Sequence, residues 1–324
     1  MSFNNAKHPM QTPRRYGHTD ICINPLGLGA AQIGDPKLDD AEVGRMLNAA
    51  VDAGINFFDS APSYGISEER LGRHLAHRRA EVVLSTKLGY GVPGVPDWTG
   101  PCITAGVDQA LRLLQTDHID IAHFHSCPRS VLEQGDVIAA LEAAKRAGKV
   151  RAMAYSGEND DLAYAIACGR FDGFMASLNI CDQRIISTLL PAMQGKGFIA
   201  KRAVANHPWR FAQRPVGDYA EGYWLRWQAM GLDNRGLEWG EISLRFALAT
   251  AGVTGAVVGT AKAAHLLHSL EWAAKGPLDA AWVAELHSAF VAHDQNWTGR
   301  FKPGLGVLPN QATKPWIVRE QLLL

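Results

Sequence analysis

The chain has 324 residues, of which 47% are hydrophobic and 20% charged, so it has ample apolar material for the core of a globular protein. Lysine plus arginine and aspartate plus glutamate both total 32, and the resulting net charge of zero gives no sign of nucleic acid or an anionic membrane as a partner. The five cysteines form no C-x-x-C pair, the N-terminal segment lacks the apolar core of a signal peptide, and no apolar run reaches the ~20 residues of a membrane span. We therefore expect a cytoplasmic protein in a reducing compartment.

Short apolar runs alternate along the chain with longer segments of helical periodicity. The first run, residues 25–31, precedes a helix from Asp39, where Glu42 three residues later resembles a capping box and Gly54 is a C-terminal stop. We expect further strands over residues 55–59, 81–87, 118–125, 149–156, 174–179, 197–201 and 253–259. Helices are expected over residues 67–77 and 132–147, and two more begin near residues 104 and 263. A short helix should end at Cys168, and another should run through Leu244. Residues 202–239 are expected to form a long loop.

Eight strand–helix units of this kind predict an α/β fold in which a parallel sheet closes into a (β/α)₈ TIM barrel. Two segments fall outside the eightfold pattern. Residues 15–25 are expected to form an N-terminal hairpin that closes the bottom of the barrel, and the C-terminal tail after Leu278 is expected to hold another helix and then an irregular stretch. No low-complexity linker divides the chain, so we expect one domain over residues 1–324.

Four reactive side chains lie where predicted strands end. Asp59 ends the second strand, Tyr64 lies in the loop beyond it, Lys87 ends the third strand and His125 the fourth. In α/β barrels the carboxyl ends of the strands and the loops that follow them carry the reactive groups. A carboxylate, a phenol, an ammonium and an imidazole are therefore expected at one rim.

This set of groups suits the reduction of a carbonyl, which requires a hydride donor and a proton for the oxyanion that develops. A free phenol, with a pKa of about 10, exchanges protons slowly near neutral pH. A lysine cation beside Tyr64 would lower the pKa of the phenol, and an aspartate beside Lys87 would keep that lysine charged despite burial. The imidazole of His125 can orient the carbonyl oxygen and share the proton.

At this point the sequence resembles the aldo-keto reductase family. The segments NFFDSAPSYG (residues 56–65), LSTK (84–87), IDIAHFH (119–125), GKVRAMAYSG (148–157) and VVGTAKAAHL (257–266) occur in the order of that family, within a resemblance over roughly residues 16–270. The resemblance implies that Asp59, Tyr64, Lys87 and His125 form a catalytic tetrad, with Tyr64 as the proton donor in reduction and the acceptor in oxidation. It also implies an oxidoreductase that transfers a hydride between a nicotinamide cofactor and an aldehyde, ketone or aldose.

The same resemblance implies a cofactor site. Gly29, Ala30 and Asp59 would lie near the nicotinamide, and Ser156 would bind the carboxamide. Met175 stands where a carboxamide-binding glutamine is usual, and Lys201 where many members place an aromatic ring. Residues 259–262 would hold the cofactor phosphate. Gly259, Thr260, Lys262 and His265 would bind the cofactor there, although His265 replaces the commoner arginine.

The segment after the last strand also favours NADP(H) over NAD(H), with NAD(H) left possible, because the family resemblance implies that the 2′-phosphate of the cofactor lies there. Thr260 directly precedes a predicted helix, whose first N–H groups and positive dipole end form an anion site. Lys262 adds a charge that could pair with the 2′-phosphate. No metal is expected.

Three other functions remain open at this stage. A metal-dependent hydrolase is raised by the pair His123 and His125, but such a site needs further ligands at other strand ends, and we expect His123 to be a satisfied polar group inside the barrel. A Schiff-base aldolase would use Lys87 as the nucleophile. The third alternative is a cofactor-binding regulatory subunit.

The substrate is expected to be a small carbonyl compound or a sugar. Tyr64 and His125 would contact it directly, and Trp98 and Trp209, in the loops after the third and seventh strands, are candidate pocket walls. The tail aromatics Trp297 and Phe301 are further candidates. Oligomeric state and physiological direction are not predicted.

Overall fold

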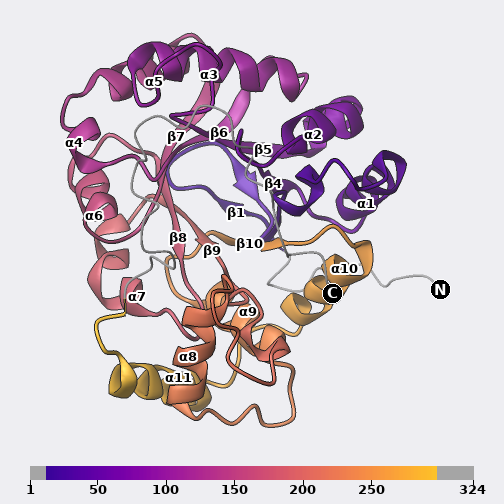
Figure 1. Cartoon of the computed structure of the whole chain (residues 1–324), viewed down its shortest axis with the longest axis vertical. Coiled ribbons are helices and arrows are strands. Elements are labelled where there is room, and N and C mark those ends of the chain that lie inside the picture. Colours follow the sequence, from indigo (N-terminus) through magenta and orange to yellow (C-terminus); the bar gives the residue numbers. More distant parts are fainter. Residues whose placement is uncertain (1–11, 298–324) are drawn as a thin grey trace.

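The computed structural model describes residues 12–297, in which eight parallel strands close into a barrel in the order β10-β3-β4-β5-β6-β7-β8-β9. Helices surround this barrel (Figure 1). The arrangement confirms the predicted (β/α)₈ fold. The barrel strands are β3 (Leu26–Gly29), β4 (Phe57–Asp59), β5 (Val83–Leu88), β6 (Ile119–His125), β7 (Val150–Ser156), β8 (Gly173–Ser177), β9 (Gly197–Lys201) and β10 (Gly255–Gly259).

The helices follow the strands in the expected alternation. They are α1 (Asp40–Asp52), α2 (Ser67–Leu75), α3 (Gly100–Leu113), α4 (Arg129–Leu132), α5 (Asp136–Arg146), α6 (Asn159–Ala167), α7 (Arg184–Thr188), α8 (Glu221–Met230), α9 (Trp239–Ala249), α10 (Ala263–Ala274) and α11 (Ala280–His293). Of the helices within residues 12–297, none combines the length and the apolar character that a membrane crossing requires.

An N-terminal hairpin closes the amino-terminal end of the barrel, as predicted. Its strands β1 (Arg14–Arg15) and β2 (Cys22–Ile23) pair antiparallel. Between them, Tyr16 is fully buried against the first residues of β8 and β9, where a Cβ added to Gly173 or Gly197 would lie 2.2 or 2.3 Å from atoms of Tyr16. The absence of side chains at these two glycines therefore makes room for the Tyr16 ring at the closed end of the barrel.

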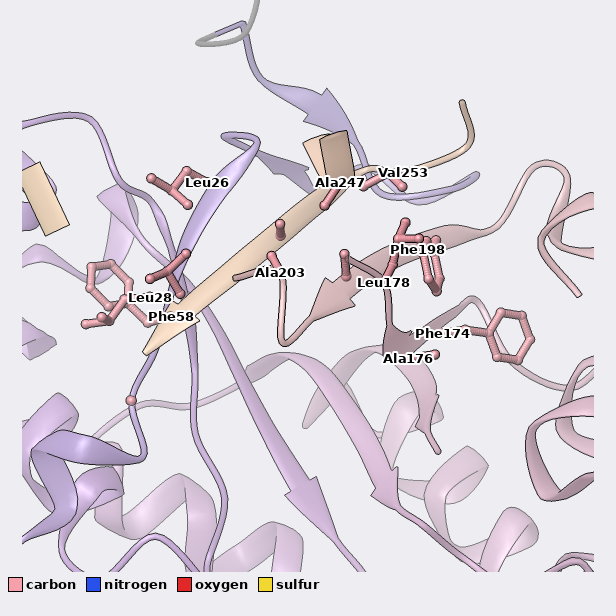
Figure 2. Close-up of a cluster of buried hydrophobic side chains, with 14 of the residues drawn as sticks. Leu26, Leu28, Phe58, Phe174, Ala176, Leu178, Phe198, Ala203, Ala247 and Val253 are labelled. Carbon is pink, nitrogen blue, oxygen red and sulfur yellow. The ribbon is translucent and has the colours of Figure 1, made fainter. Parts of the chain in front are cut away.

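Side chains alternate between the inside and the outside of the barrel because successive strand residues point to opposite faces. The inward side chains Phe57, Val83, Ile121, Met175 and Ile199 form one buried cluster with the hairpin. The outward side chains pack against the helices, and Figure 2 shows part of this second cluster, including Leu28, Phe58, Phe174 and Phe198. Inward positions further along the strands hold polar residues, and these occupy the opposite end of the barrel from the hairpin.

Local signals set several element ends correctly. The side chain of Asp39 accepts a hydrogen bond from the Glu42 N–H at 2.8 Å and caps α1, and Gly54 after that helix has a φ of +95°. Both features agree with the predicted capping box and stop signal.

Three expected elements differ in the structure. The helix expected over residues 132–147 begins only at Asp136, because Gly135 adopts a φ of +82° between the single-turn α4 and α5. The helix expected from residue 104 starts at Gly100, where the Thr99 side chain caps it. The loop expected over residues 202–239 contains α8, which the sequence hides because the buried face of this helix includes Arg226.

The segment after Leu278 contains α11, as expected. Trp297, at the end of the described residues, lies against Phe290 with ring centroids 5.8 Å apart, and the Arg226 guanidinium lies 5.1 Å from its ring. Trp297 therefore packs between α8 and α11. Phe301 lies outside the described residues.

Candidate active site

Asp59 and Lys87 form a buried ion pair at the carboxyl end of the barrel. The inward face of β4 ends at Asp59, and Lys87 is the last inward residue of β5. The Lys87 Nζ donates hydrogen bonds to Asp59 Oδ2 at 2.6 Å and to the Ser60 carbonyl oxygen at 2.7 Å. Ser85 Oγ donates to the other oxygen of Asp59 at 2.8 Å. Burial lowers the pKa of Lys87, but the Asp59 and Tyr64 side chains outweigh burial and raise the pKa overall.

Tyr64 lies next to this pair, in the loop between β4 and α2. The Lys87 Nζ is 5.0 Å from the centroid of the Tyr64 ring. Close backbone packing fixes the loop, because a Cβ on Gly34 would lie 1.7 Å from the Tyr64 carbonyl oxygen, and the Gly34 carbonyl accepts a hydrogen bond from Ile66. Burial raises the pKa of the Tyr64 phenol, and the Lys87 ammonium opposes that rise. Lys87 acts in the direction expected from the sequence, but burial outweighs it.

His125 completes the group of four. Its ring packs edge-on against Tyr64 with centroids 6.3 Å apart and an interplanar angle of 88°. Its Nδ1 is hydrogen-bonded to the hydroxyl of Tyr90. Burial lowers the pKa of His125 well below its usual value, and the cations of Lys87 and Lys201 lower it further. His125 is therefore a neutral imidazole at physiological pH.

His123 lies one inward position deeper on β6 and is completely buried. Ser85 Oγ is 3.2 Å from its Nδ1, whereas its Nε2 has no hydrogen-bond partner among the described residues. Burial lowers the pKa of His123 to about 3. The expectation of a satisfied polar group is thus met at one ring nitrogen only.

The residues expected near the nicotinamide lie on both sides of these four side chains. Gly29 pairs with Gly259 across β3 and β10, and a Cβ added to Gly29 would be 3.7 Å from the Gly259 Cα, an ordinary van der Waals contact. Ala30 is buried, and its backbone N–H donates to the Asp59 carbonyl at 2.8 Å. Gly29 thus leaves open space at this side of the barrel mouth, whereas the Gln32 side chain lies over Gly259, where an added Cβ would be 2.5 Å from its Oε1.

Ser156, Met175 and Lys201 line the opposite side of the mouth. Ser156 pairs with Met175 across β7 and β8, and both are buried. The Lys201 Nζ lies 3.3 Å from the Ser156 Oγ and 3.3 Å from a carboxylate oxygen of Glu158. Burial lowers the pKa of Lys201, and Glu158 opposes that effect. A lysine held by a carboxylate therefore stands at this side of the mouth.

Thr260, Lys262 and His265 gather at the start of α10. Thr260 Oγ1 accepts a hydrogen bond from the Lys262 backbone N–H at 3.0 Å and lies 3.5 Å from the His265 Nδ1. Lys262 is the residue before the helix, and its side chain makes no capping hydrogen bond. Both Lys262 and His265 are exposed, so their side chains can reach an anion at this helix terminus.

The two predicted wall residues lie in different surroundings. The Trp98 ring covers Gly89 and packs against Tyr90, with centroids 6.2 Å apart, so a single side chain separates it from His125. The Trp209 ring packs against His207, Trp227 and Trp239. Trp98 is thus brought to the site, whereas Trp209 joins an aromatic cluster of the loop after β9 with α8 and α9.

Several residues of the site escaped the sequence analysis. Tyr90 and Ser63, which are hydrogen-bonded at 2.9 Å, and Glu158, which binds Lys201 and Arg202, were not identified. Tyr90 is three residues beyond Lys87 in the loop after β5. Its closeness to the end of that strand could have predicted that it lies at the rim of the barrel. Within residues 12–297, His, Cys, Asp and Glu side chains form no group of three or more that could hold a metal ion.

Comparison with known proteins identifies relatives of this barrel. The sequence model of the aldo/keto reductase family matches residues 25–290. L-galactose dehydrogenase of Arabidopsis thaliana is 32% identical over 154 residues, which are 44% of this chain and 48% of that protein, so the match spans about half of the relative. D-threo-aldose 1-dehydrogenase of Pseudomonas sp is 28% identical over 297 residues, which cover 78% of this chain and 90% of that protein.

The fold has close counterparts among solved structures. The aldo-keto reductase AKR11C1 from Bacillus halodurans, in its holo form, superposes with a TM-score of 0.74 at 22% identity and covers 86% of this chain and 96% of its own. At that identity the likeness concerns the fold. The family match over most of the sequence, joined to this barrel, places the chain in the aldo/keto reductase family.

Proposed function

We propose that this chain is an NAD(P)-dependent oxidoreductase that transfers a hydride between NADP(H) and a carbonyl or alcohol substrate. The observation that carries the proposal is the placing of Tyr64 between the Lys87 ammonium, 5.0 Å from its ring centroid, and His125. A phenol beside a fixed cation can release a proton and hold the resulting charge.

In reduction, the bound nicotinamide would supply a hydride to the carbonyl carbon. Tyr64 then transfers its hydroxyl proton to the carbonyl oxygen, and the C=O bond becomes the C–O–H of the alcohol. Lys87 stabilises the phenolate left on Tyr64, while Asp59 keeps Lys87 protonated through the 2.6 Å contact. Neutral His125 orients the carbonyl oxygen by hydrogen bonding. In oxidation the same groups act in reverse.

The residues at the barrel mouth fit a nicotinamide cofactor. Gly29, where an added Cβ would meet its first neighbour at 3.7 Å, leaves space against which a flat ring can lie, and the amide of Gln32 over Gly259 offers a polar group beside it. Ser156 and Lys201 offer hydrogen-bonding groups on the other side. The start of α10 offers a phosphate the positive end of the helix dipole and the charge of Lys262. His265, whose pKa is lowered by burial and by Lys262, offers a neutral hydrogen-bonding group. We infer that these residues hold the cofactor, with NADP(H) preferred.

The electrostatics of Lys87 disfavour the aldolase alternative. A Schiff base forms from a neutral amine, whereas Asp59 and Tyr64 raise the pKa of Lys87 despite its burial. Borohydride added with a carbonyl substrate should therefore leave no adduct on Lys87. An adduct there, without nicotinamide turnover, would favour the aldolase.

Two of the relatives are named for sugars, one for L-galactose and the other for D-threo-aldoses. We propose a small aldehyde, ketone or aldose as the substrate. Trp98 beside the site offers an aromatic face that suits a sugar ring or an aryl group.

The deciding experiment combines a substrate panel with Tyr64→Phe. Aldehydes, ketones and aldoses are assayed with NADPH, NADP⁺, NADH and NAD⁺, and the best substrate is then given to the variant. Its turnover should fall at least ~10²-fold, the usual loss for a general acid, while cofactor affinity measured by fluorescence stays close to wild type. Tyr164→Phe on α6, whose ring faces Arg129, is the matched control and should retain full activity. A Tyr64→Phe enzyme within a few-fold of wild type would reject the proposed role.

A further inference from the structure

Tyr90 links His125 to the loop that holds Tyr64, without belonging to the four. It lies at the start of the loop after β5, and its ring is tilted by 31° over His125 with centroids 5.4 Å apart. Its hydroxyl is hydrogen-bonded to His125 Nδ1 on one side and lies 2.9 Å from Ser63 Oγ on the other. Ser63 directly precedes Tyr64, so this chain of hydrogen bonds starts in the loop that holds the proposed acid.

We propose that Tyr90 is a positioning residue that fixes the proton of His125 on Nε2. A phenol O–H is a stronger donor than the N–H of a neutral imidazole, and the bare imidazole nitrogen is a stronger acceptor than a phenol oxygen. The favoured arrangement therefore has Tyr90 donating its single proton to Nδ1. His125 then carries its own proton on Nε2, from which it donates to the carbonyl oxygen of the substrate. This last step rests on the proposed function.

The surroundings keep both groups in the neutral forms that this arrangement requires. Burial, aided by Lys87 and Lys201, lowers the pKa of His125, and burial raises the pKa of Tyr90. Ser63 can donate its hydroxyl proton to the Tyr90 oxygen, which leaves the Tyr90 proton for His125. The order of donation thus runs from Ser63 through Tyr90 to His125.

The loop holds Tyr90 firmly in this place. Gly89 has a φ of +127°, a conformation that favours glycine, and a Cβ there would lie 2.1 Å from the Trp98 ring. The Trp98 backbone N–H donates to the Gly89 carbonyl at 2.7 Å. Tyr90 is therefore packed between Trp98 and His125, with little freedom to change the direction of its hydroxyl.

The direct test is ¹⁵N NMR of the resting enzyme with labelled histidine, with His125 identified by the loss of its signals in His125→Gln. We expect His125 Nδ1 to give the signal of an unprotonated, hydrogen-bonded nitrogen and Nε2 that of a protonated one. In Tyr90→Phe the Nδ1 signal of His125 should move to that of a free acceptor, or the two tautomers should mix. A proton on Nδ1 in the wild type, or an Nδ1 signal unchanged in Tyr90→Phe, overturns the proposal.

A second variant guards against a folding defect. Ser63→Ala leaves every ring in place and removes only the first donor of the chain, so it should shift the same His125 signal in the same direction but less. Tyr155→Phe is the matched control, because Tyr155 belongs to the cluster outside the barrel and its hydroxyl donates to the Cys127 carbonyl at 2.8 Å, whereas His125 points into the barrel. A Tyr155→Phe shift as large as that of Tyr90→Phe would mean that loss of any buried phenol disturbs His125, and would overturn the specific role.

Kinetics test the consequence for the reaction. Tyr90→Phe should lower kcat for carbonyl reduction by about 10-fold to 10²-fold, as losing a tautomer-fixing partner does elsewhere, with the KM for the cofactor unchanged. In a His125→Gln background the same change should alter kcat by less than about 2-fold, because the two residues act as one unit. Equal losses in both backgrounds would contradict action through His125. The NMR result holds whether or not the chain reduces carbonyls, so failure of the proposed function is seen separately in Tyr64→Phe.

Discussion

The buried Asp59–Lys87 pair is arranged for chemistry more than for stability. Taking two charges out of water costs several kcal/mol per ion in real proteins, and the attraction between the two buried charges often offsets little more than that cost. Here the lysine also donates to the Ser60 carbonyl, and Ser85 donates to the aspartate, so each charge has a further partner. The result is a cation held rigidly beside Tyr64, which a pair on the surface could not provide.

Lys262 is the residue whose charge should decide the choice of cofactor. It is exposed directly before α10, beside N–H groups that favour an anion, and it opposes the helix dipole unless an anion is present. Lys262→Ala should raise the KM for NADPH by roughly 10-fold, as expected for one charge-assisted contact, while the KM for NADH hardly changes. Initial rates with both cofactors provide the measurement.

The control for Lys262 is Lys37→Ala, which removes an equally exposed positive charge from the loop before α1. It should leave both KM values unchanged. Equal shifts for NADPH and NADH in Lys262→Ala would mean that this lysine does not recognise the 2′-phosphate, and the preference for NADP(H) would lose its main support.

Single residues could be placed from the sequence where they end a strand. Asp59, Lys87 and His125 close apolar runs, and the alternation of faces along a strand directs them into the barrel mouth. Tyr90 and Glu158 could not be placed in this way, because their positions depend on loop backbone conformations, such as the positive φ of Gly89, that no periodic pattern encodes.

At the scale of elements, the loop that carries Tyr64 depends on its contact with the 3-10 helix Gln32–Gly34. A Cβ on Gly34 would lie 1.7 Å from the Tyr64 carbonyl oxygen, and backbone atoms cannot yield as a flexible side chain can. Gly34→Ala should therefore displace Tyr64 and lower kcat by up to about 10²-fold, the scale for a shift of about 1 Å at a reacting group.

Gly100→Ala at the start of α3 is the comparison for that variant. Its added Cβ would meet its nearest neighbour, the Asp136 carbonyl oxygen, at 3.4 Å, an ordinary contact, so turnover should stay at the wild-type level. If Gly34→Ala also turned over at that level with a normal melting temperature, the contact would not position Tyr64.

The elements most open to prediction were those with local signals of their own. The cap Asp39 and the stop Gly54 set the ends of α1, and β-branched and apolar runs set the barrel strands. The helix α8 was missed because Arg226 on its buried face breaks the apolar pattern; that arginine lies 3.7 Å from Asp182 and 5.1 Å from the Trp297 ring. Tertiary contacts of this kind override local periodicity.

At the scale of the whole molecule, stability and chemistry occupy opposite ends of the barrel. The hairpin and the inward apolar side chains fill the amino-terminal end, while charged and polar side chains gather at the carboxyl end. Eight strands in one closed hydrogen-bonded ring carry the two ends, and Met175, a member of the inward apolar cluster, lies between them. Changes in the hairpin should therefore alter the stability of the whole barrel and leave the site nearly intact.

Tyr16 allows this separation to be measured. Its ring is fully buried against Gly173 and Gly197, and its hydroxyl has no hydrogen-bond partner among the described residues. Tyr16→Ala should lower the free energy of unfolding by about 3–5 kcal/mol, the range for deleting a large buried ring. Tyr16→Phe removes only the unsatisfied hydroxyl, whose burial costs ~1–3 kcal/mol, so that variant should be at least as stable as the wild type. Urea unfolding measures both, and the KM for the cofactor, measured in native buffer, should be the same in all three proteins. A Tyr16→Phe variant clearly less stable than the wild type would mean that the hydroxyl is bonded, and a changed KM would mean that the two ends of the barrel are coupled.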